Sequence, residues 1–157
     1  MVMPETYEAP GGVVLHGEEL VPELPDLEVI NRWMHQISEQ EGRLIKCLYF
    51  VFLNDADLLK INQDYLEHDT FTDIITFPYS RDPVEAEIYI SGDRVRANAD
   101  QFGVSVREEL LRVMAHGVLH VCGWDDKTAR DMGMMRQREN ACLELVGFHQ
   151  PVSFPSS

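Results

Sequence analysis

Two histidines stand four residues apart, at His116 and His120, and Gly123 and two aspartates follow them closely. On an α-helix, side chains four residues apart lie about 40° apart around the axis and about one turn along it, so both imidazoles can reach one ion. A glycine three residues after the second histidine can end the helix and turn the chain back, which brings a carboxylate to the same point. This spacing predicts a Zn²⁺-type site with three protein ligands and an open position for water, the arrangement of catalytic zinc. We therefore expect a metal-dependent hydrolase.

The third ligand is either Asp125 or Asp126, since one carboxylate is enough and the other can cap the next helix. We interpret Cys122 as a packing residue, because two positions past His120 its side chain lies about 200° around the helix. The remaining histidines have no metal-like spacing and are expected on the surface or in loops: His16, His35, His68 and His149. Among them, His68 stays a candidate because it precedes a polar segment, residues 69–73.

The ligand spacing is also similar to that of the metzincin peptidases, whose motif is His-Glu-x-x-His-x-x-Gly-x-x-His. In those enzymes the glutamate beside the first histidine is the general base. The corresponding residue here is Gly117, which has no side chain to take a proton. The sequence therefore favours phosphodiester cleavage over peptide hydrolysis, because an ion can polarise a phosphoryl oxygen and stabilise the charge of the transition state.

The length and composition are typical of a small globular enzyme. A chain of 157 residues, 45% of them hydrophobic, predicts one domain over residues 1–157. No segment is apolar enough to cross a bilayer, and the first residues lack the layout of a signal peptide. The three cysteines are scattered, which fits the reducing cytoplasm. Residues 1–10 and 150–157 are expected to be loose ends.

The net charge of −14 argues against nucleic-acid binding through the overall field, and we expect no DNA partner. The charge is uneven: residues 1–91 hold 18 acidic and 5 basic side chains, and residues 92–157 hold 9 and 8. The basic residues of the second part flank the histidines on both sides: Arg94, Arg96, Arg107, Arg112, Lys127, Arg130, Arg136 and Arg138. We interpret most of them as solvated helix surface, with phosphate binding as the alternative.

The elements that must position the histidines follow from hydrophobic periodicity and from capping residues. Strands are expected at 11–16, 44–53, 73–77 and 86–91, with residues 80–83 as a turn between antiparallel neighbours. Helices are expected at 25–40, 54–66, 93–101, 105–122 and 128–146. Ser105 and Glu108 form a capping-box pattern, and Thr128 precedes the next helix.

The helix predicted at 105–122 is apolar on nearly every side. A helix of this kind belongs in the core, covered by the sheet and by the flanking helices. The metal site would then lie at the C-terminal end of a rigid, central, buried helix, with its ligands open to solvent.

Four segments in the right order resemble the YbeY family of bacterial endoribonucleases over residues 45–146. Ile61-Asn62-Gln63-Asp64-Tyr65 is similar to the family's Leu-Asn-x-x-Tyr segment. Residues 72–78 (Thr-Asp-Ile-Ile-Thr-Phe-Pro) and 86–91 (Ala-Glu-Ile-Tyr-Ile-Ser) resemble its two strands Thr-Asp-Val-Leu-Ser-Phe-Pro and Gly-Asp-Ile-x-Ile-Ser. Residues 116–126 match His-Gly-x-Leu-His-x-x-Gly-Tyr-Asp-His, with Trp124 at the tyrosine position.

This resemblance implies an α+β fold, with a mixed four-stranded sheet packed with helices. It also implies a zinc ion on His116 and His120, and single-stranded RNA as the substrate. The expected role is ribosomal RNA maturation and ribosome quality control, with ribosomal RNA and the ribosome or its assembly factors as partners.

The chain departs from the family pattern at two positions. The usual third histidine is Asp126 here, and a carboxylate ligand makes the ion a weaker Lewis acid and loosens selectivity toward Mn²⁺ or Mg²⁺. The family's arginine after the tyrosine is Leu66, which cannot bind phosphate. Arg112, one turn before His116, is the substitute RNA contact or a salt-bridge partner. Asp73 is the best second carboxylate near the site, with a hydrogen-bonding role at the strand end as its alternative.

The sequence therefore predicts a metal-dependent endoribonuclease with His116, His120 and Asp126 as ligands. Two other functions remain open at this stage. The first is a metzincin-like metallopeptidase. The second is a non-catalytic ribosome-assembly factor in which the ion only stabilises the fold.

Overall fold

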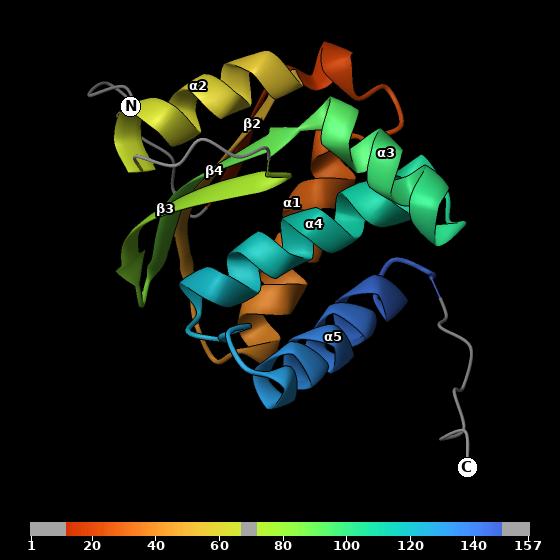
Figure 1. Ribbon diagram of the computed structural model, residues 1–157. Helices are drawn as coiled ribbons and strands as arrows, with labels where there is room; N and C mark the ends of the chain where they lie inside the picture. Colours follow the sequence, from red (N-terminus) through yellow and green to blue (C-terminus); the bar gives the residue numbers. More distant parts are fainter. Residues whose placement is uncertain (1–11, 67–71, 149–157) are drawn as a thin grey trace.

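The computed structural model describes residues 12–66 and 72–148, which form a sheet surrounded by helices (Figure 1). The strands among these residues are β1 (Gly12–His16), β2 (Ile45–Leu53), β3 (Ile74–Arg81) and β4 (Val84–Ser91). The α-helices are α1 (Leu27–Gln40), α2 (Asp55–Leu66), α3 (Gly92–Phe102), α4 (Val106–Val121) and α5 (Ala129–Glu144), and a short 3-10 helix (Glu18–Leu20) follows β1. The predicted loose ends, residues 1–10 and 150–157, lie outside the described residues.

The four strands form one mixed sheet in the order β1-β2-β4-β3. Strand β2 is parallel to both β1 and β4, whereas β3 pairs with β4 in the antiparallel direction. The predicted α+β class and mixed four-stranded sheet are confirmed. Because β3 is at the edge, one side of it is free of a partner strand within the described sheet.

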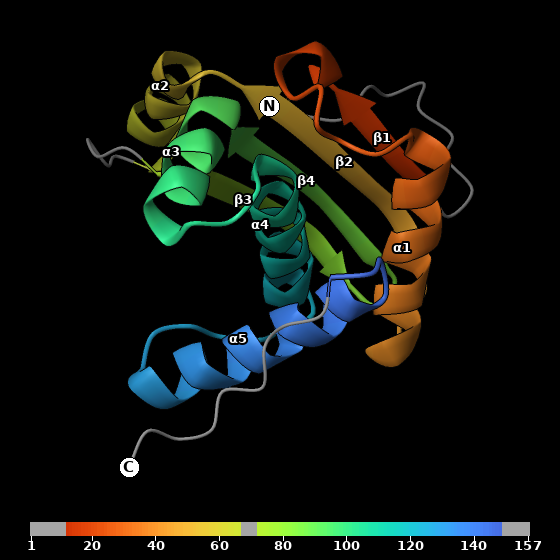
Figure 2. The same ribbon diagram turned by 90° about the vertical axis from the view of Figure 1, so that its right-hand side faces the viewer.

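The two faces of the sheet carry separate hydrophobic clusters, as the alternation of side chains along a strand requires. Leu48 and Ile88 belong to the larger cluster, which α1, α4 and α5 complete. Val51 and Tyr89 belong to the smaller one, which is covered by α2 through Leu58. Figure 2 shows α1 and α4 packed along the same side of the strands. The larger cluster is therefore the core in which α4 is held.

Strand β3 is longer than the sequence predicts, because we expected it to end at Pro78. It continues to Arg81, which pairs with Val84, so the turn shrinks to Asp82 and Pro83. Proline has no N–H for a ladder bond, but an edge strand can accommodate this on its unpaired side. The register shifts between Pro78 and Ser80, which absorbs the irregularity.

The predicted helix starts agree with the hydrogen bonds at the N-caps. The N–H of Glu108 donates to Oγ of Ser105 at 3.0 Å, and the N–H of Asp131 donates to Oγ1 of Thr128 at 3.0 Å. Asn54 accepts at the start of α2. Within residues 12–66 and 72–148, every helix falls short of the length and apolar character that a membrane span requires.

Candidate metal centre

Helix α4 carries both histidines and packs closely against β3 and β4. Gly117 makes this approach possible: a Cβ atom there would lie 2.8 Å from Cδ1 of Ile74 and 3.1 Å from Cγ2 of Ile88. A glutamate at this position would therefore point into the sheet. The missing side chain, which sets this motif apart from that of the metzincins, also allows the helix to lie against the strands.

After the C-terminus of α4 the chain turns sharply and returns toward the histidines, as expected from the position of Gly123. Gly123 has a φ of 107°, in the left-handed region that suits glycine, and its N–H donates to the carbonyl of His120 at 2.9 Å. The N–H of Trp124 donates to the carbonyl of Leu119 at 3.0 Å. These two bonds form a Schellman motif, which directs the following loop back along the helix.

The side chain of Trp124 fixes the loop that follows. Its indole N–H donates to Oε1 of Glu41, the C-cap residue of α1, and the guanidinium carbon of Arg138 lies 4.7 Å from the centre of its ring. This anchoring places the next residues, including Asp126, beside the end of α4.

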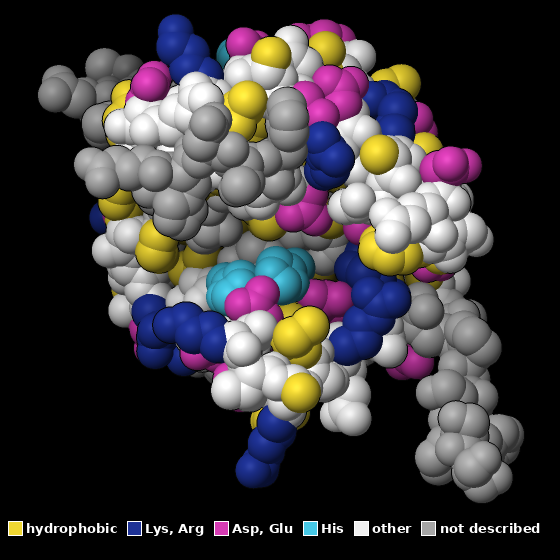
Figure 3. Space-filling view, in the orientation of Figure 1, with side chains coloured by type: hydrophobic (Ala, Val, Ile, Leu, Met, Phe, Trp, Pro, Cys, Tyr) yellow, Lys and Arg dark blue, Asp and Glu magenta, His cyan; other side chains and the backbone are white. Residues whose placement is uncertain are grey.

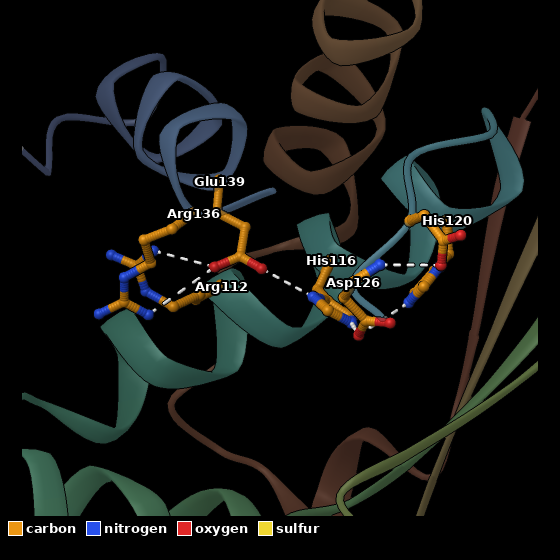
Figure 4. A network of polar contacts seen from close by, with 7 residues as sticks. Arg112, His116, His120, Asp126, Arg136 and Glu139 are labelled. Carbon is orange, nitrogen blue, oxygen red and sulfur yellow. Dashed lines mark hydrogen bonds and ion pairs between the residues drawn. The ribbon is translucent and has the colours of Figure 1, made fainter. Parts of the chain in front are cut away.

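The side chains of His116, His120 and Asp126 converge on one point (Figure 4). Oδ2 of Asp126 lies 3.3 Å from Nε2 of His116 and 3.2 Å from Nε2 of His120. In a tetrahedral zinc site with bonds of 2.0–2.2 Å, neighbouring ligand atoms are separated by about 3.4 Å. The two separations in the structure therefore fit a Zn²⁺-type ion.

The cluster is partly open to solvent (Figure 3). The exposed fractions of the side chains are 21% for His116, 32% for His120 and 39% for Asp126. A structural zinc site is normally closed by a fourth protein ligand, whereas a catalytic site keeps a position free. Among the described residues, the cluster contains three ligand side chains, so the arrangement is that of an open site.

Glu139 on α5 contacts His116 at Nδ1, the ring nitrogen that does not face the cluster. Nδ1–H of His116 donates to Oε2 of Glu139 at 2.7 Å, which leaves the lone pair of Nε2 directed at the cluster. A carboxylate in this position fixes the tautomer and orientation of a metal-binding imidazole and increases its basicity. The carboxylate is buried, and NH1 of Arg112 donates to its Oε1 at 3.1 Å.

The pKa of His116 is raised above its usual value. Burial is the largest single influence and lowers the pKa, but the hydrogen bond and the charge of Glu139 outweigh it, with smaller contributions from Asp126 and Asp73. The imidazole therefore holds its proton more tightly in the absence of a cation. A metal ion has to compete with that proton.

A hollow beside the cluster brings in two further carboxyl groups, those of Asp73 and Glu109. Burial raises the pKa of Asp73, and the charge of His116 opposes this. Burial and the neighbouring Asp73 together raise the pKa of Glu109 to about 7. The backbone carbonyl of Asp73 accepts from the N–H of Ser91 at 3.0 Å, so the residue also makes a hydrogen bond at the end of the strand.

The cluster does not include Asp125, Cys122 or the other described histidines. Asp125 is exposed, and its Oδ1 accepts from the N–H of Asp126 at 2.9 Å. Cys122 is buried in the core, as predicted. His16 is exposed at the end of β1, and His35 is on α1. His68 and His149 lie outside the described residues, and Leu66 ends α2 with a side chain that is not described.

Glu139 is a residue of this site that the sequence motifs do not predict. The residue occupies the buried face of α5 together with Met135 and Cys142, four residues before it and three after it. A charged residue on the apolar face of an amphipathic helix requires a partner. The glutamate on the apolar face can be recognised in the sequence, but the residues that it contacts cannot.

The chain is similar to a known family over most of its length. Residues 19–147 match the family described as Endoribonuclease YbeY, a wider span than the resemblance at 45–146. The Endoribonuclease YbeY of Flavobacterium psychrophilum is 48% identical over 118 residues, which are 74% of this chain and 83% of that protein. The Endoribonuclease YbeY of Amoebophilus asiaticus is 42% identical over 137 residues, 84% of this chain and 93% of that protein.

A solved structure supports the fold. The solution structure of a protein from Thermotoga maritima matches with a TM-score of 0.61 and 21% identity, over 90% of this chain and 99% of that one. At this level of identity the likeness concerns the fold alone.

Proposed function

Because the chain belongs to the YbeY family of endoribonucleases, we propose that its metal cluster is the centre at which it cleaves RNA. The family makes it a hydrolase acting on RNA in ribosomal RNA processing. The observation that supports the cluster as the active centre is its geometry: two imidazole nitrogens within 3.3 Å of one carboxylate oxygen, at an opening of the surface.

The ligands of the ion in this proposal are His116, His120 and Asp126. Two neutral imidazoles and one carboxylate suit Zn²⁺, and the carboxylate also suits Mn²⁺. When bound, such an ion polarises a phosphoryl oxygen and lowers the pKa of water.

The protein's own groups orient and balance this centre. Glu139 holds the imidazole of His116 so that Nε2 points outward, and Arg112 balances the charge of that carboxylate. Asp73 and Glu109 line the adjoining hollow, where a carboxyl group with a pKa near 7 can hold or release a proton at neutral pH. Asp73 is a catalytic candidate from the sequence, and Glu109 is added to it on the basis of its position in this hollow.

Peptide hydrolysis is not favoured. The base position of the metzincins is Gly117, and the close contact of that residue with Ile74 and Ile88 leaves no room for a carboxylate. A single-stranded substrate, ribosomal or assembly-factor partners and a cytoplasmic location complete the proposal, and they rest on the family resemblance.

Elemental analysis of freshly purified protein tests the centre, with the wild type compared with Asp126→Ala. We expect about one equivalent of zinc per chain in the wild type and a large loss in the variant, with the loss of RNA cleavage in parallel. Unchanged metal content in Asp126→Ala would contradict the proposed ligand set.

His120→Ala separates catalysis from a structural role of the metal. Lost cleavage of a single-stranded RNA with little change in the melting temperature supports catalysis. Collapse of the fold would instead identify an ion that stabilises the structure.

The peptidase alternative has its own test. Casein cleavage that is sensitive to a chelator, without any action on RNA, would favour the peptidase.

A further inference from the structure

Two hollows flank the metal cluster, and they share one wall made by α5. The first, with a volume of about 290 Å³, contains Asp73 and Glu109, and we call it the acidic hollow. The second contains Met132 and Met135, and we call it the methionine hollow. Arg136 lines both of them.

Two arginines approach the buried carboxylate of Glu139, and their surroundings differ (Figure 4). The side chain of Arg112 is 6% exposed and lies 3.1 Å from Oε1. The side chain of Arg136 is 58% exposed and lies 3.8 Å from the same oxygen. Arg112 therefore balances the buried charge, whereas Arg136 is held by a long and solvated contact from which it can turn toward a ligand.

Met132 extends the same exposed face of α5. It is one turn before Arg136, and 58% of the residue is exposed at the methionine hollow. A thioether side chain is flexible and polarisable and makes favourable contacts with aromatic rings. Beside the metal cluster, the apolar side chain of Met132 therefore offers a surface for a nucleobase, and the neighbouring cation of Arg136 offers one for a phosphate.

We infer that Met132 and Arg136 form a nucleotide subsite on α5, in which Arg136 binds a phosphate of the RNA next to the cleaved bond and Met132 contacts the base. This inference rests on the proposed function and assigns the RNA contact to Arg136 in place of Arg112. The guanidinium group has the donor geometry for bidentate phosphate recognition. The subsite places one solvent-exposed cation beside the metal cluster, in a chain whose net charge is −14.

The decisive variant is Arg136→Gln, with Arg130→Gln as the matched control. Arg130 is exposed on the same helix and lines neither hollow, so both variants remove the same charge from α5. With a fluorescein-labelled single-stranded RNA, we expect Arg136→Gln to raise KM and the anisotropy Kd about tenfold, with kcat changing little. We also expect the slope of log Kd against log salt to fall by about 0.7, the value for one phosphate contact in single strands. Arg136→Lys should recover part of the affinity.

A second pair of variants tests the base contact. Met132→Ala should raise the same KM about threefold to tenfold, whereas Met134→Ala should leave it unchanged. Met134 is 40% exposed on the same helix and lies outside both hollows, so it controls for the loss of an exposed methionine.

The outcomes separate the subsite from the proposed function. Absence of RNA cleavage by the wild-type protein would contradict the function, and the anisotropy assay would still test the subsite, because binding does not depend on cleavage. If Arg136→Gln binds and cleaves RNA like Arg130→Gln while both remain folded and retain their metal, the subsite is overturned.

Discussion

Glu139 and Glu87 are both buried glutamates, but they belong to opposite faces of the sheet and have different partners. Glu139 lies on the α4 side and contacts His116 and Arg112. Glu87, on β4, faces the α2 side and accepts from the hydroxyl groups of Tyr79 and Tyr89. The exposed fraction is 5% for the first residue and 1% for the second.

The difference in partners distinguishes the two carboxylates. Neutral hydroxyl donors satisfy Glu87 without a second charge, on the face of the sheet opposite to α4. Burial and the bond to Glu87 raise the pKa of Tyr79 to about 12, so the hydroxyl keeps its proton at physiological pH. Glu139 instead shares its charge between a cation and an imidazole that reaches the surface. Its position couples the core to the metal cluster.

Removing the buried cation should have the largest effect on the α4 side. Arg112→Gln leaves the buried carboxylate of Glu139 with the hydrogen bond from His116 and only the long contact to Arg136 as a cationic partner, and we expect a loss of about 3 kcal/mol of stability in urea unfolding. The double variant Arg112→Gln/Glu139→Gln removes both charges and should regain most of that loss. Unchanged stability with a raised KM for RNA would instead make Arg112 the RNA contact.

Glu139→Gln should weaken metal binding without removing any ligand. The amide can still accept from Nδ1–H of His116, but it lacks the charge that increases the basicity of the imidazole. We expect zinc affinity to fall about 10- to 100-fold, measured by competition with a chromophoric chelator. An affinity equal to that of the wild type would show that this carboxylate serves the fold alone, like Glu87.

The parts of this centre that the sequence predicts are those encoded by local signals. These signals each concern one helix or one turn. They are the spacing of His116 and His120, the glycine at 123, and the capping residues at 105 and 128. The helix predicted at 105–122 therefore agrees with α4, which carries both histidines and ends at Val121. The sequence does not decide between Asp125 and Asp126, because the choice depends on a loop that Trp124 anchors to the end of α1.

The unpredicted parts depend on contacts between distant elements. Glu139 follows Arg112 by 27 residues and His116 by 23, and the three meet only because α5 packs across α4. A helical pattern indicates which face is buried, but not which residue of another helix it meets. The extension of β3 past Pro78 has a similar origin, since its position at the edge of the sheet decides whether proline is tolerated.

Glu109 is a third buried carboxyl group. After burial, the largest influence on its pKa is the charge of another carboxyl group, that of Asp73. Its pKa in the folded protein, about 7, lies above the ordinary value of 4.5. Between these values the unfolded chain releases the proton and the folded protein keeps it, so stability falls as pH rises through this window and stays lower above it. Glu109→Gln should therefore stabilise the metal-free protein by about 1–3 kcal/mol at pH 8 and by little at pH 4.5. Melting temperatures at both pH values test this, and equal gains at both would contradict it.

Glu87→Gln should have the smallest effect and should leave the metal centre unchanged. The amide of the variant keeps one acceptor oxygen, so one of the two tyrosine hydroxyl groups can still donate to it. The hydroxyl group of Tyr79, which is half-exposed, can turn and accept a hydrogen bond from the new NH₂ group. We expect a loss of about 1 kcal/mol in urea unfolding. Zinc affinity should equal that of the wild type, because the side chain of Glu87 lies across the sheet from α4, whose Gly117 contacts the opposite face at Ile88. A tenfold loss of zinc affinity here would mean that the two faces of the sheet are coupled, and that the contrast between the two glutamates is one of degree.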